Sequence, residues 1–142
     1  MADNQLYLLD TDHISLLQRG NASVRTRLLQ VDLPRRSVTI ISLAEQMQGR
    51  LAVIRRASAE IDAARGFQRL YETMTFYQSV TVLPYDQQAA EEFDRLRTAR
   101  VRIGTQDLRI AAIALSQNAV LVTRNHRDFS RIPSLIIEDW SV

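Results

Sequence analysis

The chain has 142 residues, 46% of them hydrophobic, so it can bury one sizeable core and we expect a single domain over residues 1–142. It has no cysteine, which excludes disulfide frameworks, thiolate zinc sites and thiol nucleophiles and fits a reducing compartment. All 18 basic residues are arginine, which suits a phosphate-bearing partner such as a nucleic acid, but a genome rich in arginine codons explains this equally well.

The first third of the chain predicts a buried strand and two short helices. "LYLLD" (6–10) is a continuous apolar run too short for a helix, which is typical of a strand buried on both faces. The apolar spacing over 11–19 predicts a helix that ends at Gly20, and Asn21 is a suitable cap for another over 21–31. A β-branched strand over 37–41 follows, and Ser42 is expected to open the next helix.

The rest of the chain repeats this alternation. Apolar residues recur at helical spacing over 60–77 and predict an amphipathic helix; they are Ile61, Ala64, Phe67, Tyr71 and Met74. The further predicted elements are a strand at 79–85, helices over 86–101 and 105–118, and strands at 119–123 and 134–139. Strands that alternate with helices over the whole length predict an α/β fold with a mainly parallel sheet covered on both faces.

Hydropathy gives no sign of a membrane segment. No stretch approaches the roughly 18 apolar residues that a membrane helix needs. No basic region precedes the first apolar run, so we expect no secretory signal. These patterns predict a cytoplasmic protein that does not contact a membrane.

Several acids fall where parallel strands end. Asp10 closes the first strand, Glu45 lies in the first turn after the second, and Asp107 opens the helix that leads into the fourth. Asn125 and Asp128 follow the fourth strand. Sites in open α/β sheets form outside the carboxyl ends of the strands, so we expect these groups near one edge.

Each acid also has an ordinary structural explanation. "SLAE" (42–45) matches a capping box, in which Ser42 caps a helix and Glu45 bonds back to the cap. Asp107 would be favoured by the dipole of its helix, and Asp10 or Asp12 could cap the helix that follows. The combination is more informative, because gathered carboxylates repel one another unless a cation neutralises them. Oxygen ligands without cysteine favour Mg²⁺ or Mn²⁺ over zinc, and such ions assist phosphodiester hydrolysis.

Four segments carry a resemblance to a known family. They are "YLLDTDHIS" with Asp10, "SLAEQMQG" with Glu45 and Gly49, "IGTQDLRIAAIAL" with Asp107, and "LVTRNHRDFSRIPSLIIEDW" with Thr123, Asn125, Asp128, Phe129 and Trp140. In this order they resemble the motifs of the PIN-domain ribonucleases, and within them the VapC-type toxins of bacterial toxin–antitoxin pairs. The resemblance spans nearly the whole chain.

The resemblance implies a three-layer α/β/α sandwich around a mainly parallel sheet of four to five strands. It also implies a Mg²⁺- or Mn²⁺-dependent endoribonuclease that cuts tRNA, rRNA or mRNA and inhibits translation and growth until its antitoxin binds. A homodimer is expected. The implied catalytic acids are Asp10, Glu45 and Asp107, with Asp10 and Asp107 as metal ligands. The fourth position falls on Asp128, or else Asn125 serves as a neutral ligand.

Residues beside these acids have expected supporting roles. We expect Thr11, Asp12, Thr123 and Asn125 to orient the ligands, and Arg109 and Arg124 to contact the substrate. Threonine is also common at the ends of strands, and Asp12 could simply cap a helix, so these residues have structural explanations as well. The two histidines raise a metal-free acid–base mechanism, which we discount because His13 is expected to face away from the site and His126 lies in a polar loop.

Two other functions compete with metal-dependent cleavage. A haloacid dehalogenase-type phosphatase would use Asp10 as nucleophile and Asp12 as acid–base, but that family also relies on a lysine, and this chain has none. Its motif also prefers Thr or Val where this chain has Ile14. The more serious alternative is a PIN-like module that binds RNA or protein without cutting.

Overall fold

The computed structural model describes residues 4–142. Its sheet has five strands, all parallel, in the order β3-β2-β1-β4-β5. The strands are β1 Tyr7–Leu9, β2 Arg36–Thr39, β3 Thr81–Leu83, β4 Val120–Val122 and β5 Ile137–Glu138. The helices are α1 Thr11–Gln18, α2 Ala22–Leu29, α3 Ile40–Arg56, α4 Glu60–Gln78, α5 Gln87–Thr98, α6 Thr105–Ser116 and α7 His126–Phe129, with the 3₁₀ turn η1 at Leu33–Arg35.

The sheet is the middle of three layers, as predicted. Strand side chains alternate, so neighbours in β1 enter different cores: Leu8 packs with α5 and α6, whereas Leu9 packs with α1 and α2. The first core is built around Leu8, Leu83, Phe93, Ile110, Ile113, Leu121 and Phe129. The second is built around Leu9, Ile14, Val24, Val38, Val122 and Trp140. Both faces are therefore covered, which explains why the central strands β1 and β4 are continuous apolar runs.

Helix caps explain where two of the elements begin. Asp10 caps α1 by accepting the backbone N–H of His13 at 2.8 Å, and Asn21 caps α2 by accepting that of Val24 at 3.0 Å. The expected capping box at Ser42 is wrong. Thr39 is the cap of α3 and accepts the backbone N–H of Ser42 at 3.1 Å, so the helix starts at Ile40 and the strand is shorter than predicted.

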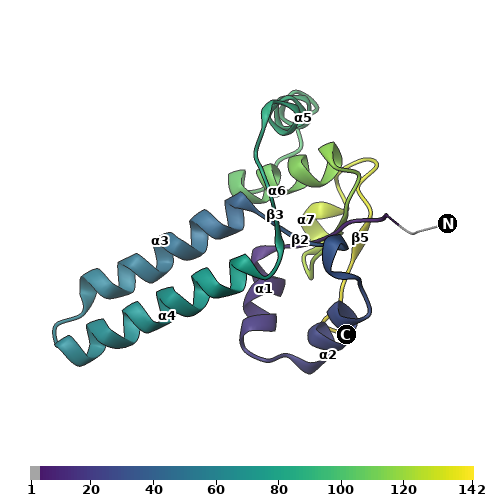
Figure 1. The fold of residues 1–142 in the computed structure, drawn as a ribbon. Helices are drawn as coiled ribbons and strands as arrows, with labels where there is room; N and C mark the ends of the chain where they lie inside the picture. The colour runs from purple at the N-terminus through teal and green to yellow at the C-terminus, as the bar shows by residue number, and fades with distance from the viewer. Residues whose placement is uncertain (1–3) are drawn as a thin grey trace.

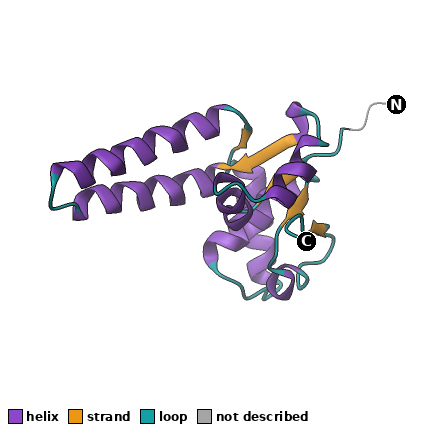
Figure 2. Ribbon diagram, turned by 90° about the horizontal axis from the view of Figure 1, so that it is seen from below, coloured by secondary structure: helices purple, strands orange, loops and turns teal. Residues whose placement is uncertain are grey.

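Helices α3 and α4 form a long hairpin that projects from the body of the molecule (Figures 1 and 2). The amphipathic helix over 60–77 is confirmed as α4, but its expected apolar stripe does not enter a core. Ile61 is 62% exposed, Phe67 57% and Tyr71 69%. The helix is buried instead through Gly66, which lies against Ile54 of α3, and through Thr73 and Tyr77 toward its C-terminal end, where Tyr77 joins the second core. The hairpin therefore presents apolar side chains to solvent.

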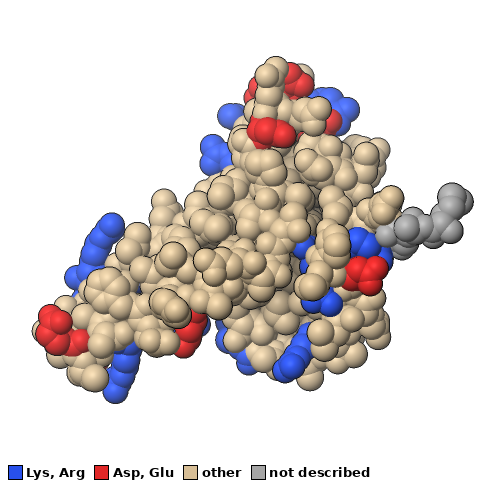
Figure 3. All heavy atoms as spheres, in the orientation of Figure 1, with Lys and Arg blue, Asp and Glu red and all other residues tan. Residues whose placement is uncertain are grey.

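Charged side chains are unevenly placed on the face seen in Figure 3. They gather at the outer end of the hairpin, around α5 and around α1 and α2, and much of the area between is uncharged. No helix formed by residues 4–142 is long and apolar enough to cross a bilayer.

The sequence does not predict the two short elements η1 and α7, since stretches of three or four residues show no periodicity.

Candidate active site

Asp10 lies where the chain changes direction across the sheet. From β1 the chain runs to β2 and β3 on one side, and later to β4 and β5 on the other, so the carboxyl end of β1 is a topological switch point. The backbone N–H of Asp10 donates to the carbonyl of Val122 at 3.1 Å, which fixes it beside the end of β4. Its side chain is buried, and Oδ1 receives the cap bond that starts α1.

Glu45 is brought to this end of the sheet by α3 and is held by α1. The hydroxyl of Thr11 donates to Glu45 Oε1 at 3.1 Å and lies 2.7 Å from the hydroxyl of Ser42. Thr11 directly follows Asp10, so this contact ties the acid after β1 to the acid after β2. The predicted supporting role of Thr11 requires such a contact. The sequence suggests only a capping role for Ser42, which is fully buried and contacts Thr11. Its position one helical turn before Glu45 is the signal that it lies beside this acid.

Asp107 lies in the first turn of α6, which begins after Gly104. Burial raises the pKa of its carboxyl, and the negative charges of Asp10, Glu45 and Asp128 raise it further. Three acids from distant parts of the sequence thus act electrostatically on the fourth. The four carboxylates that the sequence singles out are therefore close enough for their charges to interact.

Asn125 and Asp128 form one small unit at α7. Asn125 Oδ1 accepts the backbone N–H of Asp128 at 3.2 Å and caps the helix, while Asn125 Nδ2 donates to Asp128 Oδ2 at 3.0 Å. The fully buried Thr123 accepts the backbone N–H of Asn125 at 2.9 Å. Asn125 therefore acts as a cap and orients Asp128, and Asp128 is the member of the pair that raises the pKa of Asp107.

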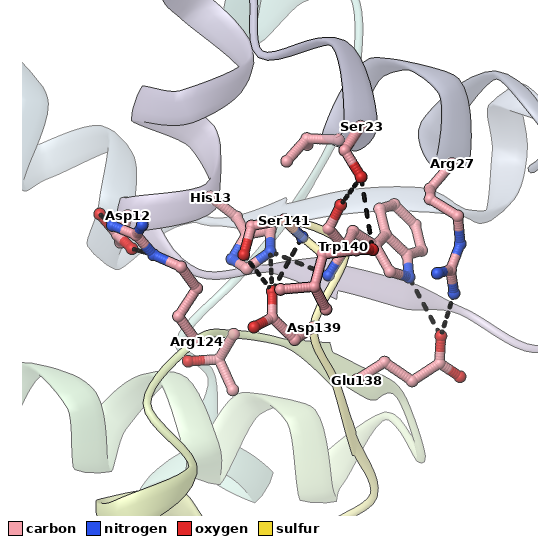
Figure 4. A network of polar contacts seen from close by, with 12 residues as sticks. Asp12, His13, Ser23, Arg27, Arg124, Glu138, Asp139, Trp140 and Ser141 are labelled. Atoms are coloured by element: carbon pink, nitrogen blue, oxygen red, sulfur yellow. Dashed lines mark hydrogen bonds and ion pairs between the residues drawn. The ribbon is translucent and has the colours of Figure 1, made fainter.

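The arginines predicted to contact substrate have protein partners. Arg124 forms a bidentate ion pair with Asp12, with N–O distances of 2.7 and 3.1 Å, and this pair is half-exposed (Figure 4). The hydrogen bond and the charge of Asp12 raise the pKa of Arg124. Arg109 donates to Gln106 at 2.8 Å and stacks near the rings of Tyr85 and Phe93. The charge of Asp10 also raises the pKa of Arg124.

The acids make an oxygen-only donor set that suits a hard divalent cation. Within residues 4–142, however, no three Asp, Glu or His side chains are already close enough together to enclose an ion. Mg²⁺ does not require such a cage, because it is held by one or two carboxylates and keeps several waters. The raised pKa of Asp107 shows what a cation would relieve, namely repulsion among the carboxylates. The residues present therefore fit Mg²⁺ or Mn²⁺ chemically.

His13 is the residue that sequence reasoning placed wrongly. It was expected to face away from the site, but its imidazole is fully buried and its Nδ1 lies 3.3 Å from Asp10 Oδ1. The other histidine, His126, is exposed at the start of α7. The helical position of His13, three residues after the cap Asp10, was the available signal, because positions i and i+3 lie on one helix face.

A family model for the PIN domain matches residues 7–135. Ribonuclease VapC1 of Haemophilus influenzae is 30% identical over 142 residues, which cover 96% of this chain and 98% of that protein. The tRNA(fMet)-specific endonuclease VapC of Salmonella typhimurium is 44% identical, and Ribonuclease VapC2 of Rickettsia felis is 36% identical, each over 69 residues. Those two matches cover 46% of this chain and only 52% of either relative.

Solved structures give the same fold over almost the whole chain. The DNA-bound VapBC complex of Salmonella typhimurium contains a chain with a TM-score of 0.78 and 30% identity, covering 96% of this chain and 98% of that one. A chain of VapBC-1 from nontypeable Haemophilus influenzae has a TM-score of 0.77 and 28% identity, with coverages of 97% and 100%. The sandwich and the parallel sheet therefore correspond to those of known chains from end to end.

Proposed function

Because the chain belongs to the PIN-domain family, and within it to the VapC-type ribonucleases, we propose that it is a metal-dependent endoribonuclease that acts as the toxin of a toxin–antitoxin pair. The reaction is hydrolysis of an RNA phosphodiester: a water oxygen bonds to phosphorus, and the bond to the leaving ribose oxygen breaks. The cofactor is Mg²⁺ or Mn²⁺.

One observation carries the catalytic part of this proposal. The pKa of Asp107 is raised by burial and by three other carboxylates, those of Asp10, Glu45 and Asp128. Such a cluster is unfavourable for folding, because like charges repel, and structural ion pairs would be expected to neutralise it. A bound divalent cation supplies that neutralisation, and it can still accept oxygens of an RNA phosphate as further ligands.

The four acids divide into two roles. Asp10 and Asp107 would hold the ion, since Asp10 is buried at the end of β1 and Asp107 is the acid whose pKa the other three charges raise. When bound, the ion lowers the pKa of a water and stabilises charge on the attacking and leaving oxygens. Glu45, oriented by Thr11, is placed to take the proton of the attacking water, and Asp128, oriented by Asn125, is placed to hold a water by hydrogen bonding.

The substrate class is single-stranded or looped RNA, such as tRNA, rRNA or mRNA. Arg124 is the arginine that would bind a phosphate of the RNA. Without RNA, its guanidinium is bound by Asp12 through two hydrogen bonds. One relative is named for tRNA(fMet), and tRNA is accordingly the substrate to test first. The cysteine-free composition fits cytoplasmic action.

A protein partner is proposed as well. Several matched structures are VapBC toxin–antitoxin complexes, so we propose that a small antitoxin binds this chain and inhibits it. The exposed apolar side chains of the α3–α4 hairpin supply surface for protein contacts, including a homodimer; they include Leu51, Val53, Ile61, Phe67, Tyr71 and Met74.

Incubation of the purified chain with tRNA tests the activity. Cleavage should require Mg²⁺ or Mn²⁺, stop in EDTA and disappear in Asp10→Asn and Asp107→Asn. Undiminished cleavage in EDTA would overturn the metal mechanism. Binding of RNA without any cut, under every metal tested, would instead favour the non-cleaving module.

A further inference from the structure

A buried histidine stands between the proposed active site and the C-terminal segment Glu138–Ser141. The imidazole of His13 has no solvent exposure and touches both regions. On one side Nδ1 lies 3.3 Å from Asp10 Oδ1. On the other side Nε2 accepts the backbone N–H of Trp140 at 3.2 Å (Figure 4). The proposed mechanism gives this residue no task.

The bond from Trp140 determines where the imidazole carries its proton. A backbone N–H can only donate, so Nε2 must offer a lone pair and the single proton of a neutral imidazole must be on Nδ1. Nδ1 is a fully buried atom that has no hydrogen-bond partner among the described residues. The nearby group able to accept its proton is the carboxylate of Asp10. A buried donor without an acceptor would be costly, so a small rotation toward Asp10 is favoured.

The competing arrangement, with the proton on Nε2, is less favourable. That proton would have to reach Asp139 Oδ1, which lies 3.4 Å away. Asp139 Oδ1 already accepts the backbone N–H and the hydroxyl of Ser141 at 2.8 and 2.6 Å. The N–H of Trp140 would then face another N–H. The contacts of Asp139 therefore hold the C-terminal segment in place and leave Nε2 to Trp140.

The segment that fixes His13 is itself anchored at several points. The indole of Trp140 is buried, and its Nε1 donates to Glu138 at 3.0 Å. Ser23 donates to the carbonyl of Trp140 at 2.8 Å, and Arg27 lies over its ring with 5.7 Å from Cζ to the ring centroid. The backbone N–H that meets His13 thus comes from a rigid part of the structure. Strand β5 contributes only two residues to the edge of the sheet, so the sheet alone would hold the segment Glu138–Ser141 weakly, and these contacts add to it.

We propose that His13 is a positioning residue for Asp10: its Nδ1–H and its backbone N–H both bond to Oδ1, so that Oδ2 stays turned toward the site. The inference rests on the proposed function, because Asp10 is taken as a metal ligand. Among residues 4–142 the Asp10 carboxylate accepts one hydrogen bond, from the backbone N–H of His13, and this bond reaches Oδ1, as does the close approach of Nδ1. Outer hydrogen bonds of this kind are worth about 10- to 100-fold in metal affinity or activity.

The first test reads the tautomer directly in the intact chain. The protein has two histidines, so ¹H–¹⁵N spectra of the imidazoles, assigned with His126→Gln, resolve His13. We expect a proton on Nδ1 and a lone pair on Nε2, as the bond from Trp140 requires. A proton on Nε2 would overturn the inference. This measurement does not depend on activity, and it uses a chain that keeps His13, so it does not require the His13 variants to fold.

The second test compares two substitutions that each keep one of the two bonds. His13→Asn keeps a donor near the position of Nδ1, whereas His13→Gln keeps an acceptor near that of Nε2. We expect kcat for RNA cleavage to fall about 10- to 100-fold in H13Q, with KM nearly unchanged, and only a few-fold in H13N. The Mn²⁺-induced rise in Tm should shrink in H13Q alone. Equal losses in both variants would show a merely structural role and overturn the inference. If the wild-type chain cleaves no RNA, the proposed function fails, and the tautomer still decides the placement of His13.

Discussion

The hydroxyl of Thr11 donates to the carboxylate of Glu45 at 3.1 Å and links α1 to α3 beside the cluster of acids. Thr11→Val removes the donor and keeps the shape of the side chain. We expect kcat to fall about 10-fold, because Glu45 loses the contact that orients it. Thr11→Ser should retain most of the activity. Thr75→Val, at an exposed hydroxyl on α4, is the matched control. Equal activity in Thr11→Val and wild type would contradict the role of Thr11.

The stability of the metal-free protein should increase when Asp107 loses its charge. The pKa of Asp107 is raised in the folded state, so its contribution to stability is complete below the pKa of the unfolded chain and is lost as the pH rises through the folded pKa. Asp107→Asn should therefore raise the free energy of unfolding at pH 7, by roughly 0.5–2 kcal/mol, the usual scale of a stabilising change of charge. At a pH below the ordinary pKa of an aspartate the carboxyl is protonated in both states, so the gain in the free energy of unfolding should vanish.

Urea unfolding at several pH values measures this effect. Asp94→Asn, at an exposed acid on α5, should leave the curve nearly unchanged. A destabilised Asp107→Asn protein at neutral pH would mean that the carboxylate has a stabilising partner, and the electrostatic description of the cluster would be wrong.

The ion pair of Arg124 and Asp12 predicts opposite effects on RNA binding. Arg124→Gln should weaken binding and reduce the slope of log Kd against log salt by about one, since one phosphate contact is lost. Asp12→Asn should strengthen binding, because the guanidinium no longer has to leave a carboxylate. Arg55→Gln, at an exposed position on α3, serves as control. If Arg124→Gln and Asp12→Asn changed RNA binding in the same direction, Arg124 would have only a structural role.

Two glycines in the hairpin should respond differently to alanine. A Cβ at Gly66 would lie 2.7 Å from Ile54 Cγ1, whereas a Cβ at Gly49 would meet nothing within 4 Å. Gly49→Ala should stabilise the protein by up to about 1 kcal/mol through helix propensity. Gly66→Ala should be less stable than Gly49→Ala by about 1–3 kcal/mol, because α3 and α4 must separate. Equal Tm values for the two variants would contradict the close packing at Gly66.

The sequence was sufficient for the order of elements and for the acids at the strand ends. Asn21 is readable as a cap, and Asp10 is one of two candidates for the cap of α1, because a cap lies directly before its helix in the sequence. The start of α3 was misplaced because Thr39 and Ser42 are both good capping residues, and only the three-dimensional end of β2 decides between them. The exposed stripe of α4 shows a further limit, since periodicity predicts an apolar face but not whether the same chain covers it.

Contacts between distant segments could not be read from the sequence. The bond from the Trp140 backbone to His13 joins residues at opposite ends of the chain, and neither side chain type indicates it. The same holds for Thr11 and Glu45, which belong to different helices. Asp12 and Arg124 were both singled out, but their mutual ion pair appears only in the fold.

Binding of Mn²⁺ to the metal-free chain, measured by calorimetry, tests the central claim that these acids form a cation site. The wild-type chain should bind the ion, Asp107→Asn and Asp10→Asn should each lose at least about 10-fold in affinity, and Asp94→Asn should bind like the wild type. The same Mn²⁺ affinity in wild type, Asp10→Asn and Asp107→Asn would contradict the claim.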